Sequence, residues 1–354
     1  MGFTHIWYMG VIRHATVTDY SAYGIPRQHP EVIKGKAGSP YAIADYYDVD
    51  PDLADHPEKR MEEWKALILR THQAGMKVIM DFVPNHVARE YYSVNKPAGV
   101  RDLGEDDDPA KSFSPQNNFY YCWGQPLDLC QILKAFPVDS SQDEYTETPA
   151  RATGNNCFSA CPSEKDWYET IKLNYGIDYC DPAGRSTHFN PIPDTWDKMT
   201  QILLFWAGMG IDGFRCDMVE MVPDSFWSYA TKAVKVRYPD LIFIGEVYDP
   251  NRYRTFIAAG FDYLYDKVGM YDTMRAIVRN ERPASDITAQ WQNKSDIFGH
   301  MLYFLENHDE QRIASDFFSG DPLKAVPAVM VGTLLQRNPF MIYNGQEFGE
   351  RGMD

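Results

Sequence analysis

Residues 77–83, with the sequence KVIMDFV, form the stretch that decides the fold. A short, nearly continuous apolar run of this kind is typical of a strand that is covered on both faces of a parallel sheet. The stretch before it, residues 60–74, is amphipathic and predicts a helix. Six more short apolar runs predict strands at residues 5–11, 210–217, 241–247, 261–265, 301–306 and 339–343. Strands that alternate with helices indicate an α/β fold.

Helical patterns lie between the later strands, at residues 195–207, 224–236 and 322–335. For the last one, Asp321 is the expected N-cap and Pro322 the first helical residue. Seven strands favour an α/β barrel over a short open sheet. One interval breaks the alternation, because residues 87–194 are rich in Pro, Asn, Asp, Gly and aromatics and too long for a simple loop. We therefore expect three parts: a first barrel segment at 1–86, an inserted domain at 87–194 and a second barrel segment at 195–354.

Charge and composition exclude several classes of protein. With 34 basic and 50 acidic residues the formal net charge is −16, which argues against nucleic acid or an anionic membrane as a partner. No apolar run approaches the roughly 18 to 20 residues of a membrane span. The first residues, MGFTHIWY, lack the features of a signal peptide. Six cysteines in 354 residues do not make a disulfide scaffold.

Polar side chains follow several of the predicted strands at the point where each strand ends. The segments are DFVPNH at 81–86, GFRCD at 213–217, GEV at 245–247 and ENHD at 306–309. In parallel α/β folds, functional groups gather at the carboxyl ends of the strands. Carboxylates, two histidines and an arginine at one end predict an acidic pocket.

Alternation of side chains along a strand sharpens this prediction. Arg215 and Asp217 are two residues apart and share one face, whereas Cys216 points to the helix layer and packs there. A neighbouring arginine keeps a carboxylate ionised, as a nucleophile requires. Paired carboxylates also perform glycoside hydrolysis, one as nucleophile and one as acid/base. For Asp81 the preferred interpretation is a structural role, in which it caps a helix or pairs with an arginine.

The four segments resemble, in order, the signature regions of the α-amylase superfamily, glycoside hydrolase family 13. The resemblance implies a (β/α)8 TIM barrel with an inserted domain B after barrel strand 3. It implies that Asp217 is the nucleophile, Glu246 the acid/base and Asp309 the transition-state stabiliser. The substrate-binding residues that it implies are Tyr41, His86, Arg215 and His308.

Three departures from the family pattern shape the expectations. The chain opens at what resembles the second barrel strand, so we expect a barrel that lacks its first βα unit in this chain, poorly stable alone, and any signal peptide would lie upstream. Where many α-amylases have a Lys-His pair for substrate and calcium, this chain has Met218 followed by Val219. No cofactor is expected to be required, and Asn85 remains as the candidate ligand for a Ca²⁺ ion. Ala42 stands where several α-glucosidases have an aspartate.

The activity expected from this resemblance is retaining hydrolysis of α-1,4-glucosidic bonds in α-glucans, of the α-amylase type. The expected partner is an α-glucan or maltooligosaccharide. Transglycosylation, α-glucosidase activity and a catalytically silent, glycan-binding role stay open as alternatives. The segment 172–176, KLNYG, resembles the family's fifth region without naming a specificity. The sequence leaves open whether the compartment is cytoplasmic, periplasmic or extracellular.

Overall fold

The computed structural model describes residues 2–138 and 144–352, so that residues 139–143 of the predicted inserted domain lie outside the described part. The chain divides into two compact units, Met1–Leu241 and Ile242–Asp354. Among the described residues, no helix is both long enough and apolar enough to cross a membrane.

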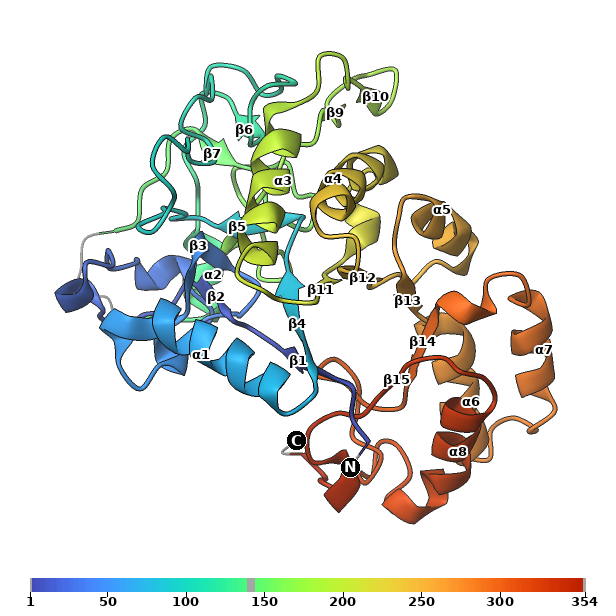
Figure 1. Cartoon of the computed structure of the whole chain (residues 1–354). Helices are drawn as coiled ribbons and strands as arrows, with labels where there is room; N and C mark the ends of the chain where they lie inside the picture. Colours follow the sequence, from blue (N-terminus) through green and yellow to red (C-terminus); the bar gives the residue numbers. More distant parts are fainter. Residues whose placement is uncertain (1, 139–143, 353–354) are drawn as a thin grey trace. The chain divides into compact units, whose positions relative to one another are not determined.

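Three parallel strands form the centre of the first unit, in the order β1 (His5–Tyr8), β4 (Lys77–Phe82) and β11 (Gly213–Cys216) (Figure 1). Trp7 on β1 lies opposite Ile79, and Arg215 on β11 lies opposite Asp81. The three strands match three of the predicted ones: β1 and β4 begin where predicted and end earlier, and β11 is shorter at both ends.

Helix α1 (Arg60–Gln73) follows the pattern read from the sequence. Trp64, Ile68 and Thr71 recur at helical spacing and are buried. Their face packs on β1, where the Tyr8 hydroxyl lies 2.8 Å from the Thr71 hydroxyl and the Tyr8 ring meets the Trp64 ring edge-on. Gly75, at a φ of +77°, supplies the left-handed residue that ends the helix.

Helices α3 (Asp194–Ala207) and α4 (Asp224–Arg237) lie side by side in the first unit (Figure 1). Trp196 of α3 and Phe226 of α4 meet with ring centroids 5.9 Å apart. The ring of Trp227 lies 6.3 Å from that of Phe82 on β4, so α4 covers one face of the strands. Cys216 is fully buried, as expected for a packing residue.

A ribbon that the sequence analysis did not predict joins β2 (Ile12–His14) to β3 (Ile43–Val49) in antiparallel fashion, with register shifts along β2. Every residue of β3 is buried, including Asp45 and Asp48. Arg13 contacts both of these carboxylates, at 3.4 and 3.3 Å, and Arg60 binds Asp48 at 2.7 Å. These ion pairs compensate the burial of the charges.

The interval 87–194 holds only short elements among its described residues. Its helix is α2 (Cys130–Ala135), and its antiparallel ladders pair β5 (His86–Ala88) with β8 (Thr170–Lys172), β6 (Tyr121–Cys122) with β7 (Ala150–Arg151) and β9 (Ile177–Asp178) with β10 (Ser186–Thr187). The rings of Tyr120, Phe158 and Tyr179 pack on one another. All six cysteines of the chain are free thiols.

The second unit contains four parallel strands in the order β12 (Ile242–Gly245), β13 (Tyr263–Tyr265), β14 (Met301–Phe304) and β15 (Phe340–Met341) (Figure 1). All four were predicted. The helices of this unit are α5 (Tyr253–Ala258), α6 (Asp272–Val278), α7 (Asp286–Asn293) and α8 (Val326–Leu334). The predicted helix at 322–335 begins as a 3-10 turn, Pro322–Ala325, and Asp321 caps it by accepting from the Leu323 amide.

A π-helical turn, Lys267–Tyr271, precedes α6 and surrounds a buried ion pair. Lys294 binds the Asp266 carboxylate with both oxygens within 2.7 Å. Gly269 lies against this pair, and a Cβ atom there would be 2.1 Å from the Lys294 nitrogen, so any side chain would displace the ion pair. Further 3-10 turns of the chain are Ser21–Tyr23, Pro30–Val32, Pro51–Leu53, Pro57–Lys59, Val219–Met221, Pro250–Arg252, Phe298–His300 and Gln346–Phe348.

Candidate active site

Hydrogen bonds to its backbone carbonyl groups hold the loop that follows β4. Tyr46 donates its hydroxyl to the carbonyl oxygens of Val83 and His86, and Tyr175 donates to that of Pro84 at 2.6 Å. The Leu173 amide donates to the Asn85 carbonyl at 2.9 Å. With both tyrosines and the loop buried, the backbone at residues 83–86 is fixed before any ligand binds.

His86 lies at the end of this loop and is 4% exposed. Burial, together with the nearby charge of Lys172, lowers the pKa of His86 to about 3. The imidazole is therefore neutral at ordinary pH and offers one N–H donor and one acceptor. The Trp167 ring centroid lies 5.3 Å from that of the His86 imidazole, so an aromatic residue of the interval 87–194 packs beside this predicted site residue.

Arg215 and Asp217 meet as their spacing predicts. One guanidinium nitrogen of Arg215 lies 2.9 Å from the Asp217 carboxylate and 3.3 Å from the Asp81 carboxylate. The same nitrogen reaches the Tyr41 hydroxyl at 3.4 Å. The structure thus brings Tyr41, Arg215 and Asp217 together, and Asp81 takes the structural role expected of it.

Trp7 completes this cluster, although sequence analysis did not single it out. Its ring lies under the Arg215 guanidinium at 5.2 Å, and its indole N–H donates to Asp81 at 3.2 Å. Arg215 is 1% exposed and Asp217 7%. A cation fixed at this distance in a buried place favours the ionised carboxylate.

The backbone turns sharply after Asp217. The Asp217 amide still donates to the Phe82 carbonyl at 2.9 Å, as in a continued strand. Met218 then adopts a φ of +42° and a ψ of 48°, in the left-handed region that side chains other than glycine rarely enter. Such a residue costs about 1–2 kcal/mol. The turn ends the strand directly behind the Asp217 carboxylate.

In the second unit, Glu246 follows β12 directly and is 3% exposed. The Tyr248 hydroxyl donates to its carboxylate at 2.9 Å. Gly245 before it packs closely, because a Cβ there would lie 2.9 Å from both Phe261 and Leu264. The glycine therefore allows β12 to pack closely against β13 directly before Glu246.

His308 and Asp309 lie after β14, and the structure pairs them. The His308 Nε2 atom is 3.2 Å from an Asp309 oxygen, and the Asp309 side chain is 45% exposed. Asn307, which is buried, accepts from the amides of Asp309 and Glu310 at 2.9 Å each. Asn307 thereby shapes the turn that presents Asp309.

The candidate calcium ligand, Asn85, has its carbonyl oxygen occupied by protein. The Lys172 nitrogen lies 2.6 Å from that oxygen, and the Asn85 amide nitrogen donates to the Gly154 carbonyl at 2.8 Å. Calcium binds oxygen ligands at 2.3–2.6 Å and would need the same place. These donors do not fit a calcium ion, and the described residues contain no group of three or more His, Cys, Asp or Glu side chains arranged around a metal position.

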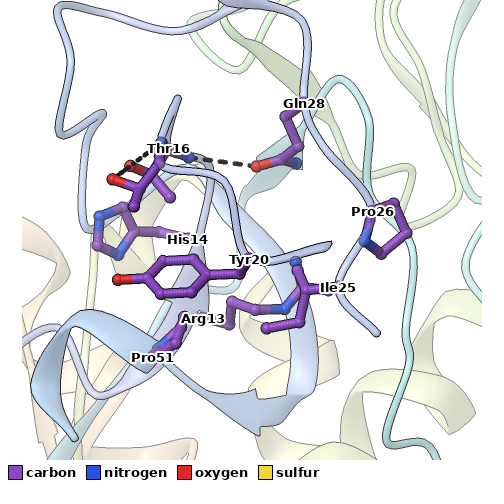
Figure 2. Close-up of a pocket in the computed structure, with 9 residues that line it drawn as sticks. Arg13, His14, Thr16, Tyr20, Ile25, Pro26, Gln28 and Pro51 are labelled. Carbon is purple, nitrogen blue, oxygen red and sulfur yellow. Dashed lines mark hydrogen bonds between the residues drawn. The ribbon is translucent and has the colours of Figure 1, made fainter. Parts of the chain in front are cut away.

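A separate small cavity lies in the first unit, beside β2 (Figure 2). None of the predicted site residues lines it. In Figure 2 the Thr16 amide donates to the Gln28 side chain at 3.2 Å. The lining residues are Arg13, His14, Thr16, Thr18, Tyr20, Ile25, Pro26, Gln28 and Pro51.

Three residues that touch the predicted site had weak signals in the sequence. Trp7 sits within a predicted strand and reads as ordinary core. Tyr248 lies two residues beyond Glu246, in the segment after β12, where strand alternation no longer assigns a face. Lys172 was part of the segment that resembles the fifth region, and only the pairing of β5 with β8 shows what it contacts.

Comparison with known proteins agrees with the geometry. Residues 1–354 match the family model described as alpha amylase, catalytic domain. "Alpha-amylase 3" of Dictyoglomus thermophilum is 25% identical over 330 residues, which are 88% of this chain and 54% of that protein. "Maltase A2" of Drosophila melanogaster is 27% identical over 308 residues, 86% of this chain and 43% of that protein.

Solved structures show the same fold. The crystal structure of an alpha-amylase from Lactobacillus plantarum aligns with a TM-score of 0.62 at 22% identity, covering 99% of this chain and 65% of that one. The chain spans about half the length of the curated relatives it matches. Because the family model extends over the whole sequence, the chain belongs to the alpha-amylase family, glycoside hydrolase family 13.

Proposed function

We propose that this chain carries the catalytic machinery of a retaining glycosidase that cleaves α-1,4-glucosidic bonds of α-glucans. Asp217 attacks the anomeric carbon and forms a glycosyl-enzyme. Glu246 first protonates the leaving oxygen and then activates the water that releases the sugar. Asp309 stabilises the positive charge that develops on the sugar ring in both transition states.

The observation that carries this proposal is the cluster around Asp217. A nucleophile must be ionised and oriented before the substrate arrives. The Arg215 nitrogen at 2.9 Å favours the ionised form, and the left-handed turn at Met218 fixes the backbone behind it. Tyr41, 3.4 Å from the same arginine, supplies an aromatic ring for a sugar to stack on. His86 is neutral, and its imidazole hydrogen-bonds the backbone of Tyr41, which links these two predicted site residues.

Endo action on a longer glucan is favoured over exo α-glucosidase action by the position after the stacking tyrosine. Ala42 is 1% exposed and belongs to an apolar cluster with Ala15, Ile33, Ala44 and Ala88. This position offers no carboxylate to grip a terminal sugar. The similarity to a protein named as a maltase keeps α-glucosidase as the second candidate.

We also propose how the strands map onto a complete barrel. The strands from β1 to β15 that run parallel correspond to barrel strands two to eight. Residues 87–194 correspond to a domain inserted after the third, and their short two- and three-residue ladders support this. Residues 139–143 of that segment lie outside the described part.

The experiment incubates the protein and its Glu246→Gln variant with maltoheptaose and follows the products and their anomeric configuration over time. The proposal expects short α-anomeric maltooligosaccharides. It expects the variant to lose activity by about 10²- to 10⁴-fold, as for removal of a general acid/base. Glu347→Gln, which changes a glutamate outside the predicted site, is the matched control and keeps its activity.

The other outcomes separate the alternatives. Products longer than the substrate assign the chain to transglycosylation, and glucose released singly assigns it to α-glucosidase. Binding without turnover identifies a silent glycan-binding member. Products of β configuration contradict the retaining mechanism altogether.

A further inference from the structure

We propose that Lys172 is a positioning residue: its side-chain nitrogen takes the place of a calcium ion on Asn85 and thereby fixes which nitrogen of His86 carries the proton. The proposal rests on the substrate-binding role proposed for His86. It concerns a residue to which no role was assigned from the sequence.

The fold places Lys172 beside the two residues it would control. Strands β5 and β8 pair antiparallel, and their register sets Lys172 directly opposite His86. Lys172 is 2% exposed and is the last residue of β8. A lysine is almost never buried unless its nitrogen has a partner. Here that partner is the Asn85 side-chain oxygen at 2.6 Å.

The contacts of Asn85 allow its amide only one orientation. The Lys172 nitrogen is a donor, so it must face the amide oxygen of Asn85. The Gly154 carbonyl is an acceptor, so it must face the amide nitrogen, which it does at 2.8 Å. Rotating the amide by 180° would break both contacts. Both a protonated and a neutral lysine donate to the oxygen, so this orientation holds in either state.

The fixed amide in turn selects the tautomer of His86. The Asn85 amide nitrogen lies 3.1 Å from the His86 Nδ1 atom. An amide nitrogen only donates, so Nδ1 must be the acceptor and the single imidazole proton must reside on Nε2. Because an amide N–H points at Nδ1, that nitrogen carries no proton and the imidazole is neutral. Lys172 therefore acts through Asn85, together with the Tyr41 backbone group that hydrogen-bonds the imidazole, to place the proton of His86 on Nε2.

Gly154 packs closely against the residues of this hydrogen-bond network. A Cβ atom at residue 154 would lie 2.9 Å from the His86 Cβ and 2.7 Å from the Thr170 hydroxyl. The Gly154 amide donates to the same hydroxyl at 3.1 Å. The closeness of Gly154 to His86 leaves no room for a side chain there.

The test is a measurement of the His86 tautomer by ¹⁵N NMR on protein labelled with ¹⁵N-histidine. His86→Gln identifies the signal among the nine histidines. The wild type is expected to show a pyridine-like Nδ1 and a protonated Nε2. Lys172→Met is expected to give a mixture of both tautomers and to lower kcat/KM about tenfold, the worth of one net hydrogen bond. Lys165→Met, at an exposed lysine of the same interval, changes neither.

Two further measurements use other readouts. Methylammonium added to Lys172→Ala is expected to restore the single tautomer, whereas Ca²⁺ is not. The thermal midpoint of the wild type is expected to be the same in EDTA and in millimolar Ca²⁺. A midpoint that falls in EDTA overturns the claim that lysine takes the place of calcium.

The outcomes for the tautomer are equally decisive. A wild-type His86 protonated on Nδ1, or a Lys172→Met variant that keeps one unchanged tautomer while losing activity, overturns the positioning role. If the tautomers behave as expected and the wild type cleaves no glucan, the positioning role stands and the proposed function fails.

Discussion

The two aspartates proposed for catalysis are held in opposite ways. In the first unit, the Asp217 side chain is 10% exposed and lies 2.9 Å from an arginine that is itself buried. In the second unit, the Asp309 side chain is 45% exposed, and the imidazole of His308 lies 3.2 Å from it. One carboxylate is built into the fold, and the other is presented on a turn.

This difference matches the chemistry assigned to each residue. A nucleophile needs a fixed position and a fixed charge before the substrate binds, which burial beside Arg215 supplies. A group that stabilises a transient cation acts fully only when the substrate has displaced water from it. Asp217 therefore contributes to the stability of the fold as well as to the proposed chemistry, whereas Asp309 contributes almost only to the proposed chemistry.

The largest effect should come from Arg215→Met, which removes the cation between Asp217 and Asp81. Both carboxylates are buried, at 7% and 4% exposed, and would lose the cation that contacts them both. Breaking a buried ion pair on one side costs about 3–5 kcal/mol. We expect a loss of stability of that size, measured by chemical denaturation.

Arg27→Met is the control, since Arg27 pairs with Asp19 at the exposed surface. It should leave the denaturation midpoint unchanged. If Arg215→Met were as stable as the wild type, the buried cluster would not be the anchor described here.

The next effect separates the two aspartates directly. Asp217→Asn and Asp309→Asn should both reduce kcat, by about 10⁴-fold or more for the nucleophile and by about 10²- to 10³-fold for the stabiliser. Only Asp217→Asn should also destabilise the fold, because Asp309 is exposed and its loss changes stability by less than about 0.5 kcal/mol. Steady-state kinetics and denaturation on the same samples measure both. Equal destabilisation by the two variants would contradict the contrast.

Tyr248→Phe tests whether Glu246 is positioned in the same way as Asp217. The variant removes the hydroxyl that donates to the Glu246 carboxylate at 2.9 Å and keeps the ring. We expect kcat/KM to fall about tenfold, the worth of one net hydrogen bond, with the fold intact. Tyr92→Phe, at an exposed tyrosine, serves as the control. Unchanged kinetics in Tyr248→Phe would show that Glu246 is held by other contacts.

The smallest effect concerns a histidine–carboxylate pair of the first unit. His14 lies 2.7 Å from the buried Asp50, and its Nε2 atom lies 3.0 Å from the Ala37 carbonyl. Burial disfavours the charged imidazole, but the Asp50 contacts outweigh it, so the pKa of His14 is raised above 6.5. The folded state then holds its proton more tightly than the unfolded state. The stability from this pair is full below pH 6.5 and is lost as the pH rises through the raised pKa.

His14→Gln should therefore flatten the decline of the thermal midpoint as the pH rises above 6.5. Melting curves across this range measure the slope. If the thermal midpoint of the wild type instead rose as the pH increased above 6.5, and His14→Gln abolished that rise, the contribution of the pair would have the opposite sign. That result would refute the assignment.

Sequence reasoning located the sheet well, for a physical reason. The three parallel strands of the first unit and the four of the second all appeared as short apolar runs, because strands buried on both faces must be apolar throughout. The alternation of side chains also predicted that Arg215 meets Asp217 and that Cys216 is buried. Asp321 was found as a helix cap because its residue type and the following proline leave few alternatives.

Other features depend on contacts between distant residues and gave no local signal. Strand β3 holds two buried aspartates, whose charges are tolerated only because Arg13 and Arg60 reach them. The pairing of β5 with β8 joins Lys172 to Asn85 across more than eighty positions of sequence. Only this contact with Lys172 shows that the Asn85 oxygen expected to bind calcium already has a partner.

The most direct test of the central claim is to trap the sugar on its nucleophile. A fluorinated α-glucosyl fluoride that forms a glycosyl-enzyme faster than water can release it would be incubated with the protein, followed by proteolysis and mass spectrometry. We predict one covalent sugar, on the peptide that contains Asp217, and none in Asp217→Asn. A sugar attached to Asp81, Glu246 or Asp309, or turnover with no covalent species and inverted product, would contradict the account.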